Sequence, residues 1–330
     1  MNIEKIIENT LSKRVIKIKK YKQLLKYLEK QKNIYLNSKN YKHANNIWKL
    51  QQVVRITYLY IESFDFLKYK KYYNAWVRLE QIENILFFLR KNFSLINSWN
   101  QLDFIEKIIY NFRVLFPYRM FVSSEYIVKS AKCSICNKKI SLRSFCGHQR
   151  GKVYKGELCV RIIDDMEFVG VSIVERPLDK TCVAFLCDEY GNIIDHYNYY
   201  FIDYVMAHLD NPFENWELKV RDKIVKSSIF YDLQDNDLCP CGSRKYFNEC
   251  CKGKENILIQ DISPVLPYKK EISKPINGIF ANTHELKIEN LGGEMKVLSP
   301  RVYTDVFHDD LLKKIDLSSI KNKSIYENHF

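Results

Sequence analysis

Cys239 to Cys251 read CPCGSRKYFNECC, a stretch with four thiols in two close pairs. The first pair has the spacing C-x-C, the second is C-C, and eight residues separate them. Zn²⁺ takes four soft ligands in a tetrahedron, which two short pairs supply when a turn brings them together. Gly242 permits the tight bend that such a turn needs, and Pro240 restricts the backbone conformation between the two cysteines of the first pair. We therefore expect a metal ion to fold this segment.

The same stretch resembles the SEC-C motif, a zinc module similar to the C-terminal tail of the SecA translocation motor and found in many other bacterial proteins. The resemblance implies zinc ligation by the four cysteines and docking of a protein partner, since the SecA tail contacts the export chaperone SecB and the ribosome. Arg244 replaces the usual Gly, and Asn248 and Glu249 stand where basic residues are common, so the partner is not implied. No G-x-x-x-x-G-K-[ST] loop occurs, so the chain is not a SecA motor. The matching residues are Cys239, Pro240, Cys241, Gly242, Ser243, Lys245, Cys250 and Cys251.

A second group of metal-binding residue types lies nearer the middle of the chain. Cys133-x2-Cys136 is followed, after nine residues, by Cys146-x-His148, a spacing typical of a zinc knuckle. Residues 133–159 also resemble a CxxC…CxH module of uncharacterised bacterial proteins, which implies no particular activity. The sequence therefore predicts two zinc sites.

The remaining thiols and the acidic pairs leave alternatives open. Cys159, Cys182 and Cys187 could join a metal site, but their placement in predicted strands favours ordinary buried thiols. Four donors with several thiolates favour closed, structural sites over catalytic ones. The acidic pairs Asp164-Asp165 and Asp309-Asp310 could instead hold Mg²⁺ for phosphodiester chemistry. A nucleic-acid-processing enzyme, such as a nuclease or a defence-type effector, is thus the alternative function.

The net charge of +13 is concentrated in one part of the chain. Residues 1–130 hold 24 Lys and Arg against 10 Asp and Glu, whereas the remainder has a net charge of −1. This basic excess is either a solvated helical surface or a surface that contacts a polyanion such as RNA or DNA. The candidate cations, which we expect to lie on one helix, are Lys13, Arg14, Lys17, Lys19, Lys20, Lys22 and Lys26.

Hydrophobic periodicity predicts helices in the N-terminal part and a mixed structure after it. Apolar residues recur every three or four positions from Asn2 to about Asn37, which predicts one long helix. The same pattern predicts helices over 47–61, 73–91 and 102–115. Beyond Pro117 we expect strands over 158–163, 168–175, 182–187 and 192–198, with a turn at 188–191, and helices over 200–209 and 214–226. Further strands over 284–289 and 295–298 and a helix near 309–315 complete the prediction.

These observations predict an α+β multi-domain protein. Its predicted segments are a basic all-α domain (1–116), an α+β domain with the CxxC…CxH site (117–231), the SEC-C module (232–256), and a linker with a short α/β tail (257–330). No signal peptide or continuous apolar span of about 18 residues occurs, so we expect a cytoplasmic location, without membrane insertion. The predicted function is a zinc-binding adaptor: the SEC-C module docks a protein or the ribosome, and the basic domain contacts a polyanion.

Overall fold

A computed structural model describes residues 3–93, 100–141, 143–231, 233–237, 239–243, 245–266, 279–280, 288–291 and 294–297. Its contacts divide the chain into two compact units. The first unit comprises Met1–Ala184, Tyr199–Trp216 and Leu266–Tyr268, and the second comprises Phe185–Asn198, Glu217–Val265 and Lys269–Phe330. Helices and sheets are both present, so the prediction of an α+β protein is confirmed. The predicted segment boundary at 116/117 lies inside the first unit, and those at 231/232 and 256/257 lie inside the second.

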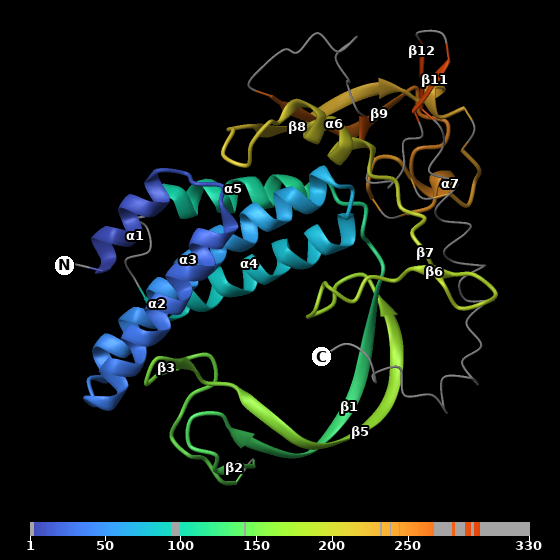
Figure 1. Cartoon of the computed structure of the whole chain (residues 1–330). Coiled ribbons are helices and arrows are strands. Elements are labelled where there is room, and N and C mark those ends of the chain that lie inside the picture. Colours follow the sequence, from blue (N-terminus) through green and yellow to red (C-terminus); the bar gives the residue numbers. More distant parts are fainter. Residues whose placement is uncertain are drawn as a thin grey trace. The chain divides into compact units, whose positions relative to one another are not determined.

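The first unit is built around a bundle of helices (Figure 1). Helix α3 is its centre, because buried side chains surround it on most sides, from Ala44 to Leu67. Aromatic side chains contribute to the core of the bundle: the buried Trp76 packs against Phe116 and Tyr118. The predicted helices over 47–61, 73–91, 102–115 and 200–209 are confirmed. The helices are α1 (Ile3–Ser12), α2 (Ile18–Asn37), α3 (Tyr41–Lys68), α4 (Tyr72–Asn92), α5 (Asn100–Leu115) and α6 (Tyr200–His208).

The prediction of one helix from Asn2 to Asn37 is wrong, because the chain breaks between α1 and α2. Arg14 adopts a left-handed conformation (φ 46°), which ends the first helix. Its guanidinium lies over the Phe104 and Phe213 rings and donates to the Phe213 carbonyl, while the Tyr21 hydroxyl donates to the Val15 carbonyl. These contacts stabilise the break, and those of Arg14 come from distant parts of the chain, which hydrophobic periodicity does not report.

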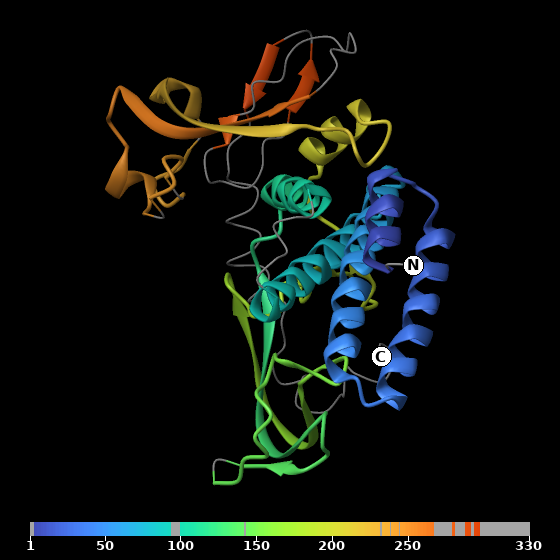
Figure 2. The same cartoon turned by 90° about the vertical axis from the view of Figure 1, so that its left-hand side faces the viewer.

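A long antiparallel ribbon follows the bundle in the same unit. Strands β1 (Phe121–Cys133) and β5 (Arg161–Val174) pair from Phe121↔Val174 to Cys133↔Arg161. In Figure 1 the ribbon descends from the helical bundle and curves beneath it toward short β2 (Lys139–Ile140), and Figure 2 shows the same curved ribbon from the side. The predicted interruption at Asp164-Asp165 is wrong. These residues are exposed on the ribbon, so their carboxylates stay in water and the strand can form without a desolvation penalty.

The second unit is organised by another long strand pair. The predicted helix over 214–226 is wrong, because Glu217–Lys226 forms strand β8. This strand pairs along its whole length with β9 (Asn256–Val265). Val225 lies opposite Ile257, and both are β-branched and buried in one hydrophobic cluster, so they gain more from cross-strand packing than from a helix.

Shorter elements complete the second unit. A tight turn around Gly191 (φ 83°), with Asp188 accepting from Asn192, joins β6 and β7, so the predicted hairpin is present with shorter arms. The β11–β12 hairpin lies where the tail strands were predicted. The elements are β6 (Leu186–Cys187), β7 (Ile193–Ile194), β8 (Glu217–Lys226), the 3₁₀ helix η2 (Ser227–Phe230), α7 (Phe247–Cys250), β9 (Asn256–Val265), β10 (Ile279–Phe280), β11 (Ile288–Leu291) and β12 (Glu294–Val297).

Some predictions fall outside the described residues. They are the linker prolines Pro267 and Pro275, the helix near 309–315, and the acidic pair Asp309-Asp310. None of the helices that the structure describes is both long enough and apolar enough to cross a bilayer.

Candidate metal centres

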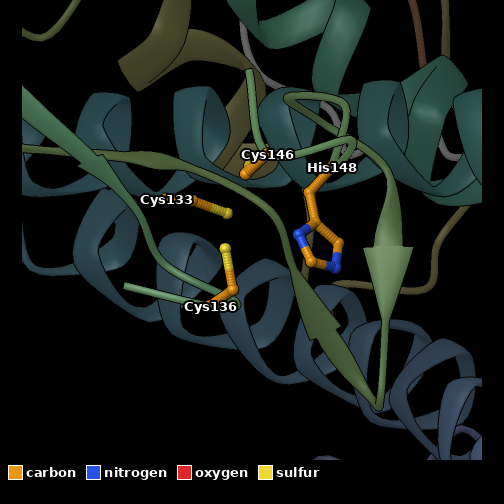
Figure 3. A group of neighbouring side chains, drawn as sticks. All are labelled: Cys133, Cys136, Cys146 and His148. Carbon is orange, nitrogen blue, oxygen red and sulfur yellow. The ribbon is translucent and has the colours of Figure 1, made fainter. Parts of the chain in front are cut away.

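The structure brings the eight predicted ligands together into two groups of four. The first centre contains Cys133, Cys136, Cys146 and His148, and its donor atoms all lie within 4.8 Å of one another (Figure 3). The second centre contains Cys239, Cys241, Cys250 and Cys251, with donor atoms equally close together. Each group could therefore hold a metal ion.

A tight turn at the end of β1 supplies the first two ligands of the first centre. Cys133 is the last residue of β1. Asn137 adopts a left-handed conformation (φ 57°), and its N–H donates a hydrogen bond to the Cys133 carbonyl at 2.9 Å. This closes the turn, so that Cys136 faces Cys133 (Figure 3). The Ile135 N–H donates to the Cys133 sulfur at 3.4 Å, a contact that favours the thiolate needed for metal binding.

The other two ligands lie in the loop between β2 and β3 (Val153–Tyr154). The His148 and Tyr154 rings pack edge to face, with their ring centres 4.7 Å apart. The Tyr154 hydroxyl accepts a hydrogen bond from the Gln149 N–H. These contacts orient the imidazole. His148 Nδ1 is buried and, within the described part of the chain, has no hydrogen-bond partner. A buried ring nitrogen that lies beside three thiols and lacks a hydrogen-bond partner is suited to bind a metal ion.

The loop is anchored to the helical bundle by the β3–β4 hairpin (β4, Glu157–Leu158). The Asn45 side chain of α3 accepts from the Gly156 N–H at 2.7 Å. The Asn92 side chain of α4 accepts from Val153 N–H at 3.0 Å and donates to the Gly151 carbonyl at 2.9 Å. The metal-binding loop is thus fixed to the bundle by side-chain amides that mimic backbone hydrogen bonding.

The second centre closes the loop between β8 and β9. Gly242 (φ 77°) donates to the Cys239 carbonyl at 3.1 Å, which confirms the predicted bend, and α7 carries Cys250 at its end. The Cys241 and Cys250 sulfurs are 3.5 Å apart, and those of Cys250 and Cys251 are 3.8 Å apart. Four sulfurs at about 2.3 Å from one tetrahedral ion are spaced about 3.8 Å from each other. The thiols therefore already lie at the edge length of a zinc tetrahedron.

The second centre is also part of a hydrophobic core. Cys239 and Cys251 are buried in one cluster with apolar side chains from both strands and from the intervening loop. Burying thiols among apolar groups excludes water from the donors, and an ion bound there would hold the loop against the strands. The cluster consists of Val225, Phe230, Cys239, Phe247, Cys251, Ile257 and Ile259.

Local hydrogen bonds favour the thiolate at one cysteine of each centre. Burial opposes ionisation of Cys133, but backbone N–H groups of Ile135 and Cys136 outweigh it and lower the pKa of Cys133 to about 7. Burial likewise opposes ionisation of Cys241, and hydrogen bonds from Ser243 and neighbouring thiols lower the pKa of Cys241 to about 6. Each centre thus contains one thiol that ionises more readily than an ordinary cysteine, and the thiolate is the form that binds a metal ion.

The three remaining cysteines differ in burial, and only one of them is buried as predicted. Cys159 is buried, as expected, and its sulfur is 3.8 Å from that of Cys133. Cys182 and Cys187 are exposed, so the expectation of buried thiols is wrong for both. Strand alternation implies burial only where a face of the strand is covered, and Cys187 ends a strand of two residues.

The acidic pair on the ribbon does not build a metal site. The Asp164 carboxylate pairs with Lys132 at 2.8 Å. Within the described ranges, the groups of three or more side chains that could hold a metal are the two cysteine centres. The alternative of a magnesium-dependent nuclease site therefore gains no support from Asp164.

The seven candidate cations are all exposed, but they do not share one helix. Lys13, Arg14 and Lys17 lie in the break before α2, and the other four lie on α2. Arg14 is held by Phe104 and Phe213, and the Lys22 ammonium lies 5.4 Å from the centre of the Tyr58 ring. Five of the seven therefore lack an aromatic partner among the described residues.

Comparisons of the chain with protein-family models, with curated proteins and with solved structures found no match. The likeness to the SEC-C motif therefore rests on the residues alone.

Gly156→Ala tests the anchoring of the metal-binding loop. Gly156 has φ 68°, and a Cβ there would lie 2.9 Å from Lys32 Cδ and 3.1 Å from the Ala44 carbonyl oxygen. We expect urea unfolding to show a loss of about 2–4 kcal/mol from strain and steric clash together. Gly191→Ala is the control, because Gly191 (φ 83°) has nothing within 4 Å and should lose only about 1–2 kcal/mol. Equal losses would contradict the anchoring.

Cys251→Ser tests the structural role of the second centre. Because Cys251 is both a candidate ligand and a core residue, the variant should lose one bound metal ion and the protease resistance of the β8–β9 loop. Cys187→Ser removes an exposed thiol of the same unit and should change neither quantity. Elemental analysis and limited proteolysis measure the two effects. Full metal content in Cys251→Ser would show that the thiol is not a ligand.

Proposed function

We propose that this chain is a zinc-binding interaction protein in which both metal centres are structural. One observation carries the proposal: each centre gathers four donors, at least three of them thiols, and neither group of described donors includes a carboxylate. Catalytic zinc keeps an open position for water or substrate, whereas four protein ligands fill a tetrahedron. Such centres hold surfaces in place, and the surfaces then carry the function.

The first of these surfaces is the exterior of the second centre. Tyr231 is 72% exposed and Tyr246 is 51% exposed, and both lie in the loop that this centre closes. Exposed tyrosines on a metal-fixed loop suit protein recognition, because they supply large contact area at little entropic cost. We assign this surface to docking of a protein partner or the ribosome, in line with the SEC-C resemblance.

The second surface is the basic row along α2 and the link before it. The exposed lysines Lys19, Lys20 and Lys26 lie on α2, with Lys13 and Lys17 preceding them. Within the described residues, none of these five ammonium groups forms an ion pair with a carboxylate. Unneutralised lysines in a row favour a polyanion such as RNA or DNA, which gains affinity by releasing counterions.

A charge-reversal variant tests the basic row. Lys19→Glu, Lys20→Glu and Lys26→Glu together should weaken binding to a mixed-sequence RNA or DNA oligonucleotide at least about tenfold. They should also reduce the slope of log affinity against log salt by about 3. Lys219→Glu, Arg221→Glu and Lys226→Glu make the same charge change on exposed residues of β8. If the β8 variant weakens oligonucleotide binding as much as the α2 variant does, binding depends only on net charge, and the assignment of the polyanion surface to α2 is wrong.

A surface variant separates docking from folding at the second centre. Tyr231→Ala with Tyr246→Ala should leave the metal content unchanged and remove nuclease-resistant proteins from an affinity purification. Asn248→Ala with Glu249→Ala, on exposed neighbours of the same loop, gives the matched comparison. The docking assignment is wrong if the tyrosine variant recovers the same partners as the parent protein.

A further inference from the structure

A fifth donor lies at the first centre. Cys159 follows the β3–β4 hairpin and is only 3% exposed, next to a fully buried Cys133. Their sulfurs are 3.8 Å apart, the separation of two thiolates on one tetrahedral zinc ion, which is about 3.8 Å for zinc–sulfur bonds of about 2.3 Å. A tetrahedral ion takes four ligands, and Cys159 is a fifth sulfur that lies beside Cys133, next to the set of four donors within 4.8 Å of one another.

The backbone holds Cys159 in this position. The Ser134 N–H donates to the Val160 carbonyl at 3.1 Å, and the Val160 N–H donates to the Ser134 hydroxyl at 2.9 Å. These two bonds tie the residue after Cys159 to the residue after Cys133. On its other side, Cys159 exchanges hydrogen bonds with Gly151 and Lys152 across the hairpin. The thiol is thus fixed beside Cys133 by its neighbours in the chain.

Cys159 and His148 also border the same small cavity. It measures about 40 Å³, and its lining includes Cys146, His148 and Cys159. Arg150 and Arg161 line it as well, and no carboxylate does. Zinc with three thiolates and an imidazole carries a charge of −1, and zinc with four thiolates carries −2. The two guanidinium groups favour the more negative set.

We propose that Cys159 is a ligand of the first centre that exchanges with His148, so that the centre has Cys₃His and Cys₄ forms. In the exchange, the Cys159 sulfur bonds to the ion as its thiol proton leaves, and the bond between the ion and His148 Nδ1 breaks. The freed imidazole can accept a proton, so the proton count of the protein is unchanged. The metal stays bound while His148 becomes available to other groups.

The test uses Co²⁺ in place of zinc in the full chain. Cobalt in tetrahedral sites absorbs visible light, and its thiolate charge-transfer band grows with the number of bound sulfurs. The variants are His148→Ala, Cys159→Ser and the double variant, with Cys182→Ser as the exposed-thiol control. His148→Asn repeats the first change with a polar side chain, in case the alanine variant folds poorly. Metal content, chelator competition and cobalt spectra are measured for each.

We expect His148→Ala and His148→Asn to keep two ions per chain and to gain thiolate charge-transfer intensity. Each single variant should lose less than about tenfold in affinity. The double variant should lose more than about 100-fold, beyond the 10–100-fold typical of outer-shell changes. The proposal is overturned if both His148 variants lose one ion. It is also overturned if their spectra gain no thiolate intensity, or do not change when Cys159→Ser is added.

Discussion

Convergence of four metal donors on one point is the constraint on which the local structure around both centres depends. Each set of donors lies within a sphere small enough for one ion, although its members come from two separated pieces of chain. At the first centre the turn after β1 meets the loop that follows β2. At the second, a glycine bend meets the end of a one-turn helix. At the second centre buried apolar side chains already pack around Cys239 and Cys251, and at either centre a bound ion would add its binding energy to the stability of the loop.

The two centres are coupled to their units in different ways. The second shares its buried thiols with a hydrophobic cluster, so metal binding and core packing stabilise the same loop. The first is tied to the helical bundle by Asn45 and Asn92, whose amides fix the β3–β4 hairpin to α3 and α4. Loss of metal should therefore disturb the core of the second unit, but only the hairpin and ribbon end of the first.

The grouping of the metal-binding residue types is predictable from the sequence, because that information is local. Spacing alone places the eight candidate ligands in the two groups that the structure brings together, and periodicity predicts α3, α4 and α5. What failed depended on distant contacts. Arg14 ends α1 because Phe104 and Phe213 hold its guanidinium, and β8 is a strand because β9 lies beside it. Cys159 was undecided from sequence, because only the hydrogen bonds between Ser134 and Val160 bring it to Cys133. A donor twenty-six residues from its partner has no spacing rule to reveal it.

Metal-dependent structure in both units is the central claim, and native mass spectrometry of the intact chain tests it most directly. Protein purified under reducing conditions should carry two zinc ions per chain. Removal by a chelator should occur in two steps, each accompanied by new protease cleavage, one within residues 133–159 and one within 227–255. A chain that carries no metal, or that keeps the same cleavage pattern after both ions are removed, would contradict the account.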